Sequence, residues 1–571
     1  MHKPRRTFIK QSALTVAALS LRPALAFQGN ITSSADGIIQ KLTELNDEKI
    51  EVQLSRQLDK PGDRWDGGVI NAYDIPNAHS TSAFLEILGA SYASPLSGYY
   101  LSGSLKKPME RAITCLLHVQ YEDGTIDLHT TNFHSTPDTA FIVNYLSPVY
   151  VLLKRLERPG LESLLQKMSS FFRNAGKCFL TGGIHTPNHR WVVCAALARL
   201  NAFFPSQKYI DRIDEWLGEG IDMDPDGQYT EKSVSIYSPV CNNMFLTIGR
   251  LLNRPELYDV VRKNLEMTLY YIQPGGEVLT DASGRQDAAR TGYVNHYYYS
   301  YRYFAIKDSN PVFSAVCSLI ETQMPERIVG QLPELLEDPV FEEDLISPSK
   351  IPHNYFRRFE HSGIFRIRRG NTDISIIEKN PTFLSFMKGK AVMQSMRLAA
   401  AFFGSLGQFI AEETALEGSS VILSSFTKHG YFQPFPEEDR PKDGDWHKMP
   451  RGMRDLSEAQ TLHVQVSITE SGGKASIELQ IDGTEHIPVS CEMSFRPGGE
   501  LSGVSKDKNT EDSYFLEGAL GTYKQGDDLI KFGPGIASHR WAQMRGMLPK
   551  QEGHSVYITG YTPFRHLIEI S

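Results

Sequence analysis

The sequence predicts two folded domains, an N-terminal (α/α) toroid of helical hairpins followed by a C-terminal antiparallel β-sandwich. In residues 33–335, apolar side chains recur at helical spacing between Gly and Pro residues. Beyond residue 352 the apolar period changes to two, which is typical of strands with one buried face. Successive helices with short connections favour stacked hairpins, and short strands between turn signals favour a sandwich.

These patterns divide the chain into an export signal at 1–26, the toroid at 27–335 and the sandwich at 336–571. Residues 323–352 are rich in Pro, Glu and Asp, which predicts a linker between the domains. The long segment 433–455 is either a lid or a mobile loop. The clearest helical stretches are 38–54, 109–119, 139–156, 191–204, 234–252, 257–272 and 297–306, and the clearest strands are 364–368, 374–376 and 462–466.

Composition limits the classes of protein to consider. The 571 residues are 41% hydrophobic and 22% charged, as in a folded globular protein rather than a disordered chain. A net charge of -8 disfavours a nucleic-acid-binding surface. The six cysteines form no Cys-x-x-Cys pair, so we expect neither a disulfide framework nor a zinc site.

The first 26 residues have the pattern of an export signal. A basic start with Arg5 and Arg6 precedes a short apolar stretch, and Ala24 and Ala26 suit a signal peptidase. The paired arginines resemble a twin-arginine signal, and an ordinary secretory signal would equally imply export. Since no apolar run reaches spanning length, we expect a periplasmic or secreted protein with no membrane span.

Three segments of the toroid concentrate polar side chains, and the first is 123–138. Ser135 or Thr136 can cap a helix whose first turn contains Pro and Asp. Asn132 and His134 then lie on the loop that leads into this helix. This segment is either part of a site or a capped turn with a solvated histidine.

The second segment, 182–191, predicts a helix capped by Thr186 whose opening turn contains Asn188, His189 and Arg190. Unpaired backbone N–H groups and the helix dipole attract anions to such a turn. An amide, an imidazole and a guanidinium added there would bind a carboxylate. The alternative is that Asn188 and Arg190 only satisfy neighbouring backbone groups.

The third segment, 222–237, opens like a calcium loop, but Ser233 stands where an EF-hand needs a bidentate Glu. We expect instead a turn that positions Tyr229, Glu231 and Tyr237. Further along the chain, Arg285 and Arg290 supply two guanidiniums, and the tyrosine-rich stretch 295–303 contains His296. Tyrosines at this density suit the wall of a sugar-binding groove.

Asn188-His189-Arg190-Trp191 at a helix start, followed about fifty residues later by Asp-Gly-x-Tyr-x-Glu-x-Ser-x-x-x-Tyr, resembles the heparinase II/III-like polysaccharide lyases. The pair of arginines after Gly284 resembles the related chondroitin and hyaluronate lyases. Two features depart from these families. The His-x-His-x-Asp-like stretch of many heparinase-type sheet domains is not evident, and Glu231-Lys232 stands where the chondroitin type has a His.

The resemblance implies a toroid followed by a β-sandwich, and cleavage of an acidic, uronate-containing polysaccharide by β-elimination without a metal or organic cofactor. It implies that Tyr237 acts as base and acid, with His189 as its partner and Asn188 at the substrate carboxylate. The remaining residues are assigned to substrate binding. They are Arg190, Asn132, His134, Arg285, Arg290, His296, Tyr229, Glu231 and Trp191.

Two other functional classes remain open at this point. A glycoside hydrolase on an α/α barrel would use two carboxylates, which Asp138, Asp226 and Glu231 could provide. A non-catalytic glycan-binding protein would keep the aromatic groove without needing the Tyr, His and Asn group.

Overall fold

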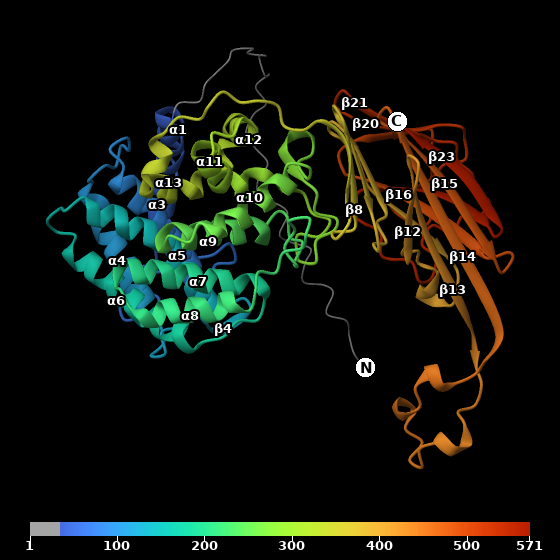
Figure 1. The fold of residues 1–571 in the computed structure, drawn as a ribbon, viewed down its shortest axis with the longest axis horizontal. Coiled ribbons are helices and arrows are strands. Elements are labelled where there is room, and N and C mark those ends of the chain that lie inside the picture. Colours follow the sequence, from blue (N-terminus) through green and yellow to red (C-terminus); the bar gives the residue numbers. More distant parts are fainter. Residues whose placement is uncertain (1–34) are drawn as a thin grey trace.

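The computed structural model describes residues 35–571 and confirms the predicted architecture of a helical toroid followed by an antiparallel β-sandwich (Figure 1). The toroid ends with a helix at residue 337, and the first strand of the sandwich begins at Asn354. The expected export signal at 1–26 lies outside the described residues.

The helices of the toroid alternate between an inner and an outer ring. The inner helices have buried residues on every side, whereas the outer ones bury one face. All seven predicted stretches contain helix. The inner helices are α3 (Ala78–Ala93), α5 (Thr136–Arg155), α7 (Pro187–Phe203), α9 (Tyr237–Leu252) and α11 (Tyr298–Lys307); the others are α1 (Ala35–Asp47), α2 (Ile50–Arg56), α4 (Gly103–Val119), α6 (Glu162–Thr181), α8 (Gln207–Gly218), α10 (Glu256–Thr268), α12 (Pro311–Gln323) and α13 (Leu332–Glu337).

Three short antiparallel strand pairs lie in the loops of the toroid. They are β1 (Val69–Ile70) with β2 (Pro76–Asn77), β3 (Ile126–Leu128) with β4 (Asn132–Ser135), and β5 (Glu277–Val278) with β6 (Gly292–Tyr293).

The linker prediction for 323–352 is wrong for most of that segment. Residues 325–342 form 3-10 turns and α13, and they pack against the toroid. The Glu337 carboxylate, 3% exposed, pairs with the guanidiniums of Arg199 and Arg250. The segment 325–342 is therefore part of the toroid. Its acidic residue Glu337 can be buried there because Arg199 and Arg250, which are distant in the sequence, neutralise its charge.

The β-sandwich consists of two sheets. All neighbouring strands are antiparallel except β19 and β22. The first sheet has the order β18 (Ser505–Lys506), β19 (Ser513–Phe515), β22 (His554–Tyr561), β16 (Pro488–Phe495), β11 (Ala391–Ala400), β10 (Leu384–Lys388), β9 (Thr372–Ile377), β8 (Ile364–Arg369) and β7 (Asn354–Phe359). The second has the order β12 (Glu413–Glu417), β13 (Ser420–Phe432), β14 (Leu456–Ser471), β15 (Lys474–Gly483), β23 (Phe564–Ile570), β21 (Asp528–Gly533), β20 (Gly521–Gln525) and β17 (Glu500–Ser502).

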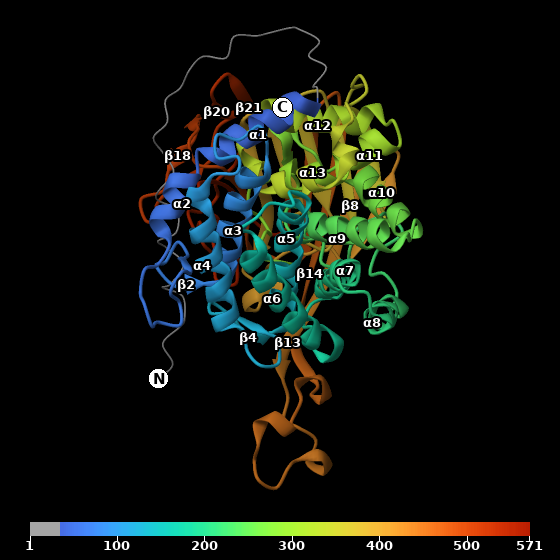
Figure 2. The same ribbon diagram turned by 90° about the vertical axis from the view of Figure 1, so that its left-hand side faces the viewer.

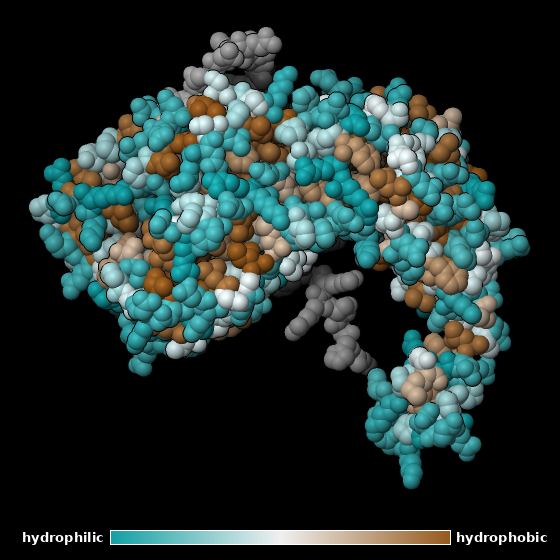
Figure 3. Space-filling model, viewed as in Figure 1, coloured by the Kyte–Doolittle hydropathy of each residue, from teal (hydrophilic) through white to brown (hydrophobic). Residues whose placement is uncertain are grey.

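The first sheet faces the toroid. All six residues of β9 are buried, because one face of the strand packs in the sandwich and the other lies at the domain interface. There the guanidinium of Arg366, fully buried, pairs with Asp373 at 2.8 Å and donates to the Tyr270 carbonyl at 2.9 Å. The second sheet lies on the far side, and the space-filling view shows the two domains enclosing a concave space below their contact (Figure 3).

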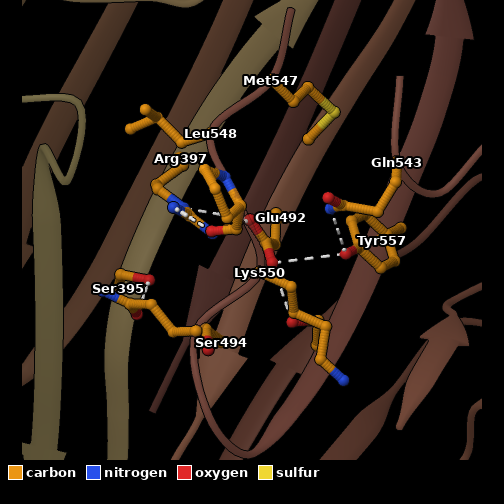
Figure 4. A network of polar contacts seen from close by, with 12 residues as sticks. Ser395, Arg397, Glu492, Ser494, Gln543, Met547, Leu548, Lys550 and Tyr557 are labelled. Atoms are coloured by element: carbon orange, nitrogen blue, oxygen red, sulfur yellow. Dashed lines mark hydrogen bonds and ion pairs between the residues drawn. The ribbon is translucent and has the colours of Figure 1, made fainter. Parts of the chain in front are cut away.

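A strap at 534–553 covers part of the first sheet through a buried polar network (Figure 4). The Glu492 carboxylate accepts hydrogen bonds from Arg397 at 2.6 and 3.0 Å, and from Ser555 at 2.7 Å. Arg397 also donates to the Pro549 carbonyl at 3.1 Å, and Tyr557 accepts from Gln543. A buried ion pair with this many partners holds the strap on the sheet.

Residues 433–455 form an arm that joins β13 to β14 and extends away from both domains in two views (Figures 1 and 2). Three 3-10 turns shape the arm: Glu437–Asp439, Trp446–Lys448 and Arg451–Met453. The guanidinium of Arg454 lies 4.7 Å from the Trp446 ring. In this position the arm does not cover the toroid.

The six cysteines are free and buried, which agrees with the composition. Within residues 35–571, every helix is too short or too polar to cross a bilayer.

We expect Glu492→Ala to lower the free energy of unfolding of the sandwich by ~3–5 kcal/mol, because it leaves the Arg397 guanidinium buried without its counter-ion. The measurement is urea unfolding followed by circular dichroism. Glu478→Ala, on an exposed position of β15, is the matched control and should change stability by less than about 0.5 kcal/mol. Equal losses in the two variants would contradict the importance of the pair.

Candidate active site

The first turn of α7 supplies two of the predicted residues. As expected, Thr186 is at the N-cap position and Pro187 is the first helical residue, but the Thr186 side chain makes no capping hydrogen bond. Asn188 is fully buried, and its amide donates to the Glu231 carboxylate at 2.6 Å and to the Thr186 hydroxyl at 3.2 Å. This contact joins the start of α7 to the segment 229–237.

The segment 229–237 and the loop 281–290 meet at Arg285. The Nε of Arg285 lies 3.2 Å from the Glu231 carboxylate, and its guanidinium lies 5.0 Å from the centre of the Tyr237 ring. The amide of Gln286 donates to the Tyr237 hydroxyl at 2.6 Å. Asn188, Glu231, Arg285 and Tyr237 therefore form one continuous group, although they come from three separate segments.

Asp287 holds the loop 281–290 against the segment that contains Tyr237. Its buried carboxylate accepts from the hydroxyls of Ser233 and Ser235 at 2.9 and 3.0 Å, from the Ser235 backbone N–H, and from the Ser283 hydroxyl. Each of these donors would lose its buried partner if the carboxylate were absent. Asp287 is thus a positioning residue that the sequence analysis missed.

His189 lies next to this group and is 8% exposed. Burial, together with the nearby His185, lowers the pKa of the imidazole to about 4. The His189 ring contacts the rings of His185 and Phe141 edge-on, at centroid distances of 4.6 and 6.1 Å. The imidazole is therefore neutral near pH 7 and is able to accept a proton or a hydrogen bond.

A second polar group surrounds Asp138 at the start of α5. As predicted, Ser135 caps this helix, accepting from the Asp138 backbone N–H at 3.2 Å. The Asp138 carboxylate contacts His79 at 3.2 Å and accepts from Asn132 at 2.8 Å. Burial alone would raise the pKa of Asp138, but hydrogen bonds from His79, Ser135 and Asn132 outweigh it and lower that pKa.

Three residues assigned to substrate binding have partners within the toroid. Arg190 pairs with Asp222 at 2.9 Å and with Glu219 at 3.2 Å, which leaves no free guanidinium edge for a carboxylate. Trp191 is fully buried and donates to Asp222 at 3.0 Å. Tyr229 is 2% exposed and donates to Asn242 at 2.9 Å.

Three other candidates do not join the group around Arg285. The ring of His134 is exposed, stacks on Tyr121 at 3.8 Å and contacts Asp123 at 3.0 Å. Arg290 is exposed and lines a narrow cavity between the toroid and the first sheet. His296 is exposed in the 3-10 turn Val294–Tyr297 that precedes α11, and no contact among the described residues connects it to Tyr237.

The three carboxylates considered for a hydrolase have separate structural partners. Glu231 is paired with Asn188 and Arg285, and burial raises its pKa. Asp226 accepts the backbone N–H groups of His361 and Ser362, at 2.7 and 2.8 Å, and thereby connects the toroid to the turn between β7 and β8. Nothing in these contacts pairs two carboxylates across an open space.

The sandwich supports the site through backbone contacts. Lys232, next to Glu231, donates to the Ser362 carbonyl at 3.0 Å, and Asn380 donates to the Asp281 carbonyl at 3.1 Å. Within residues 35–571, no cluster of three or more His, Cys, Asp or Glu side chains is arranged to hold a metal ion.

Comparison with solved structures identifies the fold. A chondroitin AC lyase of Streptomyces coelicolor A3 matches with a TM-score of 0.55 and 12% identity, over 95% of this chain and 80% of the other. Heparinase III matches with a TM-score of 0.53 and 10% identity, over 97% and 87% of the two chains. This chain has the polysaccharide lyase fold.

A xanthan lyase of Paenibacillus shares this lyase fold, with a TM-score of 0.54 and 9% identity over 95% of this chain and 58% of the other. No family model and no curated protein matches the sequence. The lyase fold is therefore recognised from the arrangement of the helices and strands.

We expect the imidazole of His189 to titrate with a midpoint near pH 4, because its buried neutral form is favoured. The unfolded chain binds a proton at this residue below about pH 6.5. His189 therefore reduces stability as the pH falls from about 6.5 towards 4. Proton NMR of the histidine ring signals checks the midpoint, with His189→Gln to assign the signal. A midpoint near 6.5 would contradict the burial of a neutral ring.

Proposed function

We propose that this protein is a polysaccharide lyase that cleaves a uronate-containing polysaccharide by β-elimination. The observation that carries the proposal is the Arg285 guanidinium, which lies between the Glu231 carboxylate and the Tyr237 ring. The lyase fold supports the assignment, and Asn188 and His189 lie beside the same group. From the first 26 residues we also infer that the chain is exported, to where such polymers are found.

The reaction first requires neutralisation of the uronate carboxylate. The C5 proton is only weakly acidic until the negative charge that develops on its removal can delocalise into the carboxyl group. Arg285 contacts Glu231 through Nε. Its two terminal nitrogens, which have no partner among the described residues 35–571, can therefore bind the uronate carboxylate bidentately. Each preorganised donor of this kind contributes ~3 kcal/mol to stabilisation of the transition state.

Asn188 assists at the same carboxylate through Glu231. Its buried amide donates to the Glu231 carboxylate and to the Thr186 hydroxyl. Because Glu231 also pairs with Arg285, this amide helps to hold the guanidinium that binds the substrate.

Tyr237 is the proposed base and acid. The amide of Gln286 donates to the Tyr237 oxygen, and the Arg285 guanidinium lies 5.0 Å from the centre of the Tyr237 ring. Neutral His189 is the partner base that takes the phenol proton of Tyr237 and leaves a phenolate. The phenolate takes the C5 proton, the C5–H electron pair forms the C4=C5 double bond, and the C4–O bond breaks. The leaving C4 oxygen then takes that proton from Tyr237, which restores the phenolate.

A screen of uronate polymers tests the proposed reaction. We expect ultraviolet absorbance from an unsaturated sugar to grow when the full chain is incubated with at least one polymer of glucuronate, iduronate, galacturonate, mannuronate or guluronate. New reducing ends without that absorbance would mean hydrolysis. Binding with neither signal would mean a non-catalytic glycan-binding protein.

We expect Tyr237→Phe to abolish turnover of the polymer identified in that screen, because the variant loses only the oxygen that moves the proton. Folding, measured as Tm, and binding of the polymer should remain close to those of the wild type. Tyr561→Phe, at a partly exposed tyrosine on β22, is the matched control and should turn over normally. Normal turnover by Tyr237→Phe would refute its role.

A further inference from the structure

The outer face of the second sheet contains a groove that the proposed reaction does not use. Its volume is about 320 Å³, which falls in the range of small-molecule sites. Side chains on β13, β14 and β15 alternate, so Leu423, Val464 and Leu479 enter the core while their neighbours face outward. Because the first sheet faces the toroid, this groove opens on the opposite side of the sandwich (Figure 1).

Strand register aligns the outward side chains in two rows. Glu413, Ser424, Gln465 and Gln480 are successive partners across four strands. With strands about 4.8 Å apart, this row is about 14 Å long, which exceeds the width of one sugar ring.

Phe426, His463 and Asp482 are successive partners in the second row. The Phe426 ring is 47% exposed and lies 4.5 Å from the His463 ring. An exposed aromatic face therefore borders a line of hydroxyl, amide and carboxylate groups.

This combination fits the two surfaces of a pyranose. The apolar C–H face of a sugar ring packs against an aromatic ring, and its hydroxyls both donate to carboxylates and accept from amides. The Gln480 amide already donates to Asp482 at 3.2 Å, which holds both side chains in place before a ligand arrives.

Charge selects which sugars fit. Glu412, Glu413 and Asp482 line the groove, and no Lys or Arg is among the described residues that line it; Arg565, the partner of Gln480 on β23, lies beyond its edge. The three carboxylates therefore disfavour a uronate or sulfated chain inside the groove, whereas a neutral sugar meets no such repulsion. The arrangement also offers no cluster of His, Cys, Asp or Glu suited to a metal ion within residues 35–571.

We propose that the groove on β12–β15 is a second, non-catalytic binding site for neutral sugar residues of a glycan. It would hold the enzyme on neutral chains or branches while the toroid, on the opposite side, remains free for an acidic segment. Binding of a neutral sugar in the groove does not depend on the proposed lyase reaction, because the groove and the group around Arg285 are on separate domains, whereas the holding role rests on the proposed function.

The test is isothermal titration calorimetry of the full chain with three neutral probes, cellohexaose, xylohexaose and mannohexaose. We expect at least one of them to bind, and Phe426→Ala and Gln465→Ala each to weaken that binding about tenfold or more. Leu567→Ala, at a 48% exposed apolar residue of β23 outside the groove, is the matched control and should bind normally.

A second comparison separates this site from the catalytic one. Tyr237→Phe should bind the neutral probe as the wild type does, and Phe426→Ala should retain normal turnover of a short soluble uronate substrate. The inference is overturned if none of the three probes binds, if Phe426→Ala binds as tightly as the wild type, or if glucuronate oligosaccharides displace the probe. Binding of the cationic probe spermine without any neutral sugar would also overturn it, since the groove would then select positive charge.

Discussion

The candidate site depends on the contacts that the Arg285 guanidinium makes. This guanidinium connects the Glu231 carboxylate to the Tyr237 ring, and Glu231 in turn holds the Asn188 amide. These groups come from the start of α7, the segment before α9 and the loop 281–290. Because a guanidinium is planar and permanently charged, one side chain can both fix this geometry and provide the cation that the chemistry needs.

The rest of the structure keeps that loop in place. Asp287 attaches the loop to Ser233 and Ser235, while Asp226 and Lys232 attach the same segment to the turn between β7 and β8. The sandwich is in turn fixed to the toroid by the buried pair of Arg366 and Asp373. Contacts with the sandwich therefore help to hold the segments of the toroid that form the candidate site.

The elements that local rules decide could be predicted from the sequence. Thr186 and Pro187 placed Asn188 and His189 in the opening turn of α7, and alternation identified the strands β8, β9 and β14. The roles of residues with a distant partner could not be predicted. The sequence near Arg190 contains no acidic partner for its side chain, but Asp222, thirty-two residues later, forms an ion pair with it. Helix α3 was not among the predicted helical stretches. Its small and apolar residues are buried on every side, so its sequence shows no helical period of apolar residues.

By itself, the sequence determined the two fold classes and the residue types available for chemistry, since turn signals and hydrophobic periods are local properties of the chain. Only the tertiary structure decided which of those residues act together. It gave Arg190, Trp191 and Tyr229 partners within the toroid, brought Arg285 and Gln286 to Tyr237, and placed Phe426 and Gln465 on one exposed sheet face. The reason is physical: burial and ion pairing depend on neighbours in space, and those neighbours are tens of residues apart along the chain.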